Sequence, residues 1–198
     1  HPRLFLFFVI AAIGLAVGAA VRLPPLFVAS DRCQACHNGL TTPKGEDISI
    51  GFDWRSSLMA PAAGDPYWQA STRREILANP KIAAAAEHEC SACHMPMARY
   101  QAKAAGGSGI VFAHLPAAPV GGPQAALALD GVSCTLCHQI GPEKLGQKES
   151  FSAGFVVDHA APAGARRIFG PYDIDLGRRT AMRSSSGSCC SRVHHAAS

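Results

Sequence analysis

Hydrophobic residues are concentrated at the start of this chain. Residues 4–21 are an uninterrupted uncharged run between Arg3 and Arg22, close to the minimum length that crosses a bilayer as a helix. A basic residue precedes the run and small residues follow it, so it predicts a cleaved export signal or an uncleaved membrane anchor. A buried core helix is the third alternative, but the run has no polar face. We assign residues 1–30 to targeting, which delivers the remainder to the periplasm or the outer face of the cytoplasmic membrane.

The pattern beyond residue 60 predicts short helices. Asp65 and Pro66 form a helix start, because Asp caps free amides and Pro is tolerated in the first turn. The helix is expected over 67–78 and to stop before Asn79 and Pro80. A second, alanine-rich helix is expected over 82–87, running directly into Cys90.

Regular structure is expected to be sparse in the second half of the chain. Glycines at 106–109 and prolines within 116–123 predict long loops. Residues 110–112 and 155–157 are the strand candidates, and both are brief. The expected fold class is therefore mainly α with long loops and little or no sheet.

Composition changes this picture in two ways. The 198 residues suffice for one domain, which we place at 31–198. Much of the hydrophobic content of that domain is alanine, so something other than large side chains must fill its core. The formal charge of +4 comes from scattered Lys and Arg without a dense basic run, so no nucleic-acid partner is expected.

The eight cysteines include three Cys-x-x-Cys-His motifs, CQACH, CSACH and CTLCH. This is the attachment signature of a c-type haem. Two thiols three positions apart lie on one side of a helical turn and can each add to a vinyl group of one porphyrin, while the adjacent His faces the iron. The attachment residues are Cys33, Cys36, Cys90, Cys93, Cys134 and Cys137, and the proximal ligands are His37, His94 and His138.

Zinc binding and disulfides are the alternatives for paired cysteines. Neither chemistry requires a His after the second Cys, and three such coincidences in one chain are negligible. We therefore predict three covalent haems, each with its iron, and a haem-packed multihaem cytochrome c in which the porphyrins serve as the missing core.

The second axial position of each iron decides between a carrier and an enzyme. The candidates are His88, His114 and His159, with Met59 as a thioether alternative. Three further histidines are enough to saturate three irons, which favours electron transfer over catalysis. An iron left open would instead indicate a fragment of a multihaem oxidoreductase acting on a small nitrogen or sulfur compound.

Three segments, WRSSLMAPAAGDPYW, EHECSACHMPM and DGVSCTLCHQI, make the chain resemble multihaem c-type cytochromes related to the tetrahaem electron carriers of ammonia-oxidising bacteria. The resemblance covers about residues 31–183. It implies closely paired haems that pass electrons between a periplasmic oxidoreductase and membrane acceptors, with redox proteins as partners. It also places proximal ligands at His37, His94 and His138, and possible distal ligands at His88 and His114.

The chain departs from this family near its end. Family members continue into another CxxCH motif, whereas here adjacent Cys189 and Cys190 are followed by His194 and His195 with the wrong spacing. A truncation or a reading-frame error after about residue 187 is the interpretation, with a fourth haem expected in the natural protein.

Overall fold

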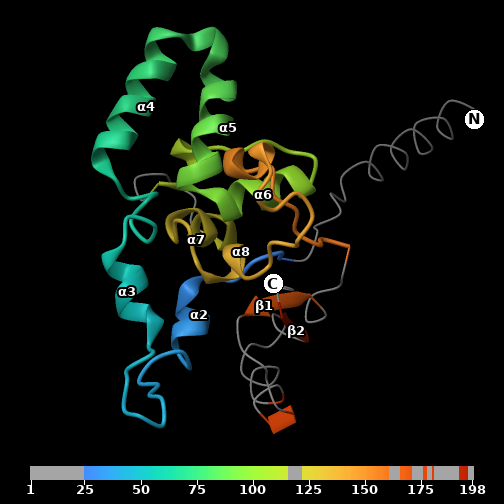
Figure 1. The fold of residues 1–198 in the computed structure, drawn as a ribbon. Coiled ribbons are helices and arrows are strands. Elements are labelled where there is room, and N and C mark those ends of the chain that lie inside the picture. The colour runs from blue at the N-terminus through green and yellow to red at the C-terminus, as the bar shows by residue number, and fades with distance from the viewer. Residues whose placement is uncertain are drawn as a thin grey trace, which may run out of the picture.

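The computed structural model describes residues 25–115, 122–160 and 166–170, together with 176–177, 180 and the backbone of 192–195. Within these ranges the chain is mainly helical, as the sequence predicts (Figure 1). The α-helices are α2 (Ser30–Gln34), α3 (Ile50–Ser56), α4 (Pro66–Ala78), α5 (Ala83–His94), α6 (Pro96–Ala104), α7 (Pro123–Leu129) and α8 (Cys134–Cys137). Three 3₁₀ turns lie at η1 (Pro80–Ile82), η2 (Phe112–His114) and η3 (Lys148–Ser152).

Helices α4 and α5 form a hairpin that projects from the rest of the described chain (Figure 1). The Asp65 side chain accepts hydrogen bonds from the amides of Tyr67 and Trp68, which confirms the predicted cap. The end at Ala78 is also as predicted. Helix α5 is longer than expected, because it continues through the whole second Cys-x-x-Cys-His motif to His94.

A small core lies where α6, α7 and α8 meet. Met95 and Met97 are fully buried in it, so they serve packing. Tyr100 packs edge-on against Phe27 and is stacked on Phe155. The exposed large hydrophobic side chains of the described residues outnumber the fully buried ones.

An extended segment at residues 25–30 crosses this core and is held by side chains on both sides. The amide of Leu26 donates to the Gln101 side chain at 2.6 Å, and Gln139 donates to the Leu26 carbonyl at 3.0 Å. At its end, Asp130 accepts from both the amide and the hydroxyl of Ser30. The start of α2 is thereby fixed beside the chain that leads into α8.

Both strand candidates are wrong. Residues 110–112 run into η2, because Glu87 accepts hydrogen bonds from the amides of Val111 and Phe112 and so turns the chain. Around Val157 there is one isolated bridge, to Ile140. The sheet among the described residues is instead a parallel pair, β1 (Arg167–Gly170) with β2 (Arg192–His195).

Two further expectations concern residues outside the described ranges. Of the loop expected over 116–123, residues 116–121 lie outside the described ranges and Pro123 begins α7. The hydrophobic run at 4–21 also lies outside them. Among the helices that the structure describes, none has the length and hydrophobicity to cross a membrane.

Candidate functional site

Each Cys-x-x-Cys-His motif forms a helical turn. The amide of His37 donates to the Cys33 carbonyl at 2.9 Å, and the amide of His138 donates to the Cys134 carbonyl at 3.0 Å. The second motif occupies the last turns of α5. The cysteine pairs of the second and third motifs, Cys90 with Cys93 and Cys134 with Cys137, are thiols, so each of these pairs is available on one helical turn.

The imidazole of His94 is held from two directions. Its Nδ1 lies 2.7 Å from the carbonyl oxygen of Ala62, and the Trp68 indole is stacked on its face, with ring centroids 4.0 Å apart and planes 1° apart. A carbonyl only accepts hydrogen bonds, so Nδ1 must carry the proton. The lone pair of the neutral ring is then on Nε2, which is free to bind a metal.

The third motif repeats this arrangement with a different acceptor. Nδ1 of His138 lies 2.6 Å from the Phe169 carbonyl oxygen, and the Phe169 amide donates back to the His138 carbonyl at 2.7 Å. Strand β1 thus orients the imidazole of His138. In the same way, the segment at residues 57–64, which contains Ala62, orients the imidazole of His94. Two of the three motif histidines therefore share the tautomer and support that a metal-ligating imidazole requires.

The first and third motifs lie next to each other. A hydrogen bond from the Cys33 thiol lowers the pKa of Cys134 to about 7, so these two sulfur atoms are in contact. The segment before α2 holds the two motifs together. The Thr135 hydroxyl donates to the Val28 carbonyl at 2.8 Å and accepts from the Val28 amide at 3.2 Å. One residue of the third motif thereby docks the chain that leads into the first.

Replacing Thr135 with Val tests this docking. Val has the same shape but leaves the part-buried amide and carbonyl of Val28 without their partner, so the free energy of unfolding should fall by about 1 kcal/mol. Urea unfolding of the two variants and the unsubstituted chain measures it. Thr180→Val is the matched control, because Thr180 is exposed, and it should change stability by less than about 0.5 kcal/mol. Equal effects of the two substitutions would contradict the docking role.

Both ring nitrogens of His88 already have neighbours. Nδ1 accepts from the Gly109 amide at 2.9 Å, and Nε2 lies 3.1 Å from an Arg99 guanidinium nitrogen. Desolvation lowers the pKa of His88, and the Arg99 charge lowers it further. To serve as a distal ligand, His88 would have to exchange at least one of these contacts for an iron.

His114 ends η2 and is half-buried. Desolvation lowers its pKa, which keeps the imidazole neutral, as a ligand must be. Glu87 and a cation–π contact from Arg73 to Phe112, 3.5 Å from the ring centroid, fix this turn against α5 and α4. Glu87 lies about two helical turns before His94, so the turn that ends at His114 is attached at Phe112 to the α4–α5 hairpin that carries the second motif.

His159 and Met59 are at the surface. His159 is exposed, with one long contact of 3.4 Å from Nδ1 to the Val157 carbonyl. Met59 is also exposed, and its carbonyl accepts from the Val132 amide at 3.0 Å. Because Ala62 in the same segment supports His94, the 57–64 segment connects the second motif to the chain before the third.

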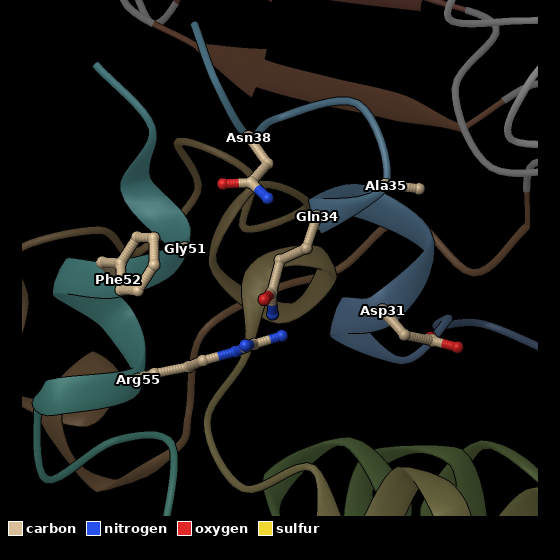
Figure 2. A pocket seen from close by; sticks show the side chains of 7 residues that line it. All are labelled: Asp31, Gln34, Ala35, Asn38, Gly51, Phe52 and Arg55. Atoms are coloured by element: carbon tan, nitrogen blue, oxygen red, sulfur yellow. The ribbon is translucent and has the colours of Figure 1, made fainter. Parts of the chain in front are cut away.

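A cavity of about 240 Å³ adjoins the first motif (Figure 2). It lies between α2 and α3, and Gln34 and Arg55 extend toward each other across it. Its volume is below the range of about 300–1,000 Å³ typical of small-molecule pockets. A porphyrin, if attached at this motif, would therefore need the open surface beside α2 and α3, where Ile50 and Phe52 are exposed.

Sequence reasoning missed the groups that orient the imidazoles of His94 and His138. The carbonyls of Ala62 and Phe169 carry no sequence signal, because any residue offers the same backbone oxygen. Trp68 could be placed at a helix start from the Asp65 cap, but its contact with His94 depends on how α4 packs on α5.

Comparison with protein-family models, with curated proteins and with solved structures finds no match to this chain. Within the described ranges, no group of three or more His, Cys, Asp or Glu side chains is arranged to hold a metal ion.

Proposed function

We propose that this chain is an exported c-type cytochrome that carries three covalent haems and transfers electrons. The observation that carries the proposal is the state of His94 and His138. Each imidazole donates its Nδ1 proton to a backbone carbonyl and so offers Nε2 as a ligand, within a helical turn that also holds two free thiols.

The residues of the three motifs fit a covalently attached haem. Cys33 and Cys36, Cys90 and Cys93, and Cys134 and Cys137 would form the thioethers, with the following His as proximal ligand in each motif. The surplus of exposed hydrophobic side chains also supports the proposal, because bound porphyrins would remove such surface from water. When bound, haem supplies a reversible one-electron couple at its iron.

The chain's own part in electron transfer is to set where the attachment points lie and how each ligand is oriented. Contact between Cys33 and Cys134 joins the first and third points. The 57–64 segment connects the third attachment point to the second. Met59 in this segment is hydrogen-bonded to Val132, and Ala62 is hydrogen-bonded to His94. All three points therefore belong to one described unit, with redox proteins outside the cytoplasmic membrane as the proposed partners and residues 4–21 as the proposed signal or anchor.

The second candidate is a fragment of a multihaem oxidoreductase with an open iron. The observation that favours it is the engagement of His88 by Gly109 and Arg99, since a histidine held in this way leaves one fewer sixth ligand for three irons.

An optical spectrum and an intact mass of the full chain, produced in a host that matures c-type cytochromes, test both candidates. We expect a mass that exceeds the mature peptide by three haems and a low-spin reduced spectrum that carbon monoxide does not change. Carbon monoxide binding would support the oxidoreductase instead. A colourless chain at its peptide mass would refute both.

A further inference from the structure

Trp68 has a buried indole N–H without an acceptor. The side chain is 8% exposed, and its Nε1 finds no hydrogen-bond partner within the described part of the chain. Indole nitrogen is a donor only, and a buried donor left unpaired loses the hydrogen bond that water would otherwise give it. Such a group calls for an acceptor from outside the polypeptide, which can be a water, an ion or a bound ligand.

The other tryptophan has a hydrogen-bond acceptor within the protein. Nε1 of Trp54 donates to the Val132 carbonyl at 2.8 Å. Trp68 lies instead flat against the imidazole of His94, with its position set by the Asp65 cap at the start of α4. The unpaired donor is therefore beside the ligand of the second motif.

We infer that Trp68 is a positioning residue for the haem of Cys90, Cys93 and His94: its ring fixes the plane of the imidazole, and its N–H donates to a propionate of that haem. This rests on the proposed function. The propionates are the oxygen acceptors that the porphyrin carries. A hydrogen bond to a carboxylate is the stronger, charge-assisted kind. The parallel indole restricts rotation of the imidazole about its bond to the iron.

Two substitutions separate the two roles. Trp68→Phe keeps a flat ring on His94 but removes the N–H, so negative charge on the propionate is less dispersed and the ferric state is favoured. The midpoint potential of one haem should fall, with the other two unchanged, in a potentiometric titration of the haem-loaded chain. Trp68→Leu removes the flat ring as well, and should in addition change the g-values of one low-spin ferric signal in electron paramagnetic resonance.

Two controls tie these shifts to Trp68 and the second haem. Trp54→Phe removes an N–H that already has a protein acceptor, and should leave the potential of the second haem unchanged. In a chain that also carries Cys90→Ala and Cys93→Ala, Trp68→Phe should leave the remaining haems unchanged.

The outcomes separate the proposals. A full complement of three haems with an unshifted titration in Trp68→Phe overturns the propionate contact, and unchanged g-values in Trp68→Leu overturn the orienting role. Absence of haem from the unsubstituted chain overturns the proposed function and this inference together.

Discussion

Cys90→Ala combined with Cys93→Ala should yield a chain that matures with two haems instead of three. Without the thiols, neither thioether can form, and the imidazole of His94 alone does not retain a porphyrin through denaturation. The same result is expected for Cys33 with Cys36, and for Cys134 with Cys137. Intact mass after denaturation counts the haems directly.

The chain contains its own control. Cys189 and Cys190 are adjacent and not part of a Cys-x-x-Cys-His motif, so Cys189→Ala with Cys190→Ala should leave three haems. A chain that keeps three haems after loss of a motif pair, or loses one with this control pair, would refute the assignment of the attachment sites.

Gly131→Ala should be the most destabilising single substitution of a glycine near the sites. Gly131 has a φ of +62°, and a Cβ there would lie 2.5 Å from the Met59 carbonyl oxygen and 2.6 Å from that of Ala60. Both are backbone atoms that cannot rotate away, so the strain of the left-handed conformation adds to a direct clash. We expect a loss of about 3 kcal/mol in the free energy of unfolding, measured by urea unfolding of the haem-loaded chain.

Gly106→Ala is the matched control. Gly106 also has a positive φ, +77°, but a Cβ there meets nothing within 4 Å, so it reports the conformational cost alone, about 1 kcal/mol. If the two variants lose the same free energy of unfolding, that result contradicts the close packing of the 57–64 segment on Gly131. That packing matters for the second motif too, because Ala62 in the same segment accepts the Nδ1 proton of His94.

Trp68 and Thr135 show how few contacts connect the sites. Thr135 couples the first motif to the third through Val28, and Trp68 covers the ligand of the second. A substitution at either position touches no attachment residue, yet both are expected to change the behaviour of the haem-loaded chain. If the proposed haems are bound, ligand orientation and haem attachment should therefore be separable by mutation.

Local signals predicted several elements correctly. The cap at Asp65 and the stop at Ala78 were readable because capping and proline chemistry act within a few residues. The strand at 110–112 was wrong, because a side chain from 24 residues earlier, Glu87, accepts the amide of Val111 and turns the chain. Helix α7 was missed, since the glycines and prolines before it indicated loop although Pro123 takes a first-turn position.

The sequence by itself determined the chemistry that each motif offers, because two thiols and an imidazole within five residues are brought together by one helical turn. Only the tertiary structure decided the contact between Cys33 and Cys134, the carbonyls that orient His94 and His138, and the position of Trp68. These contacts join residues from 26 to 101 positions apart along the chain. Their formation depends on how the segments pack against one another, which no local pattern encodes.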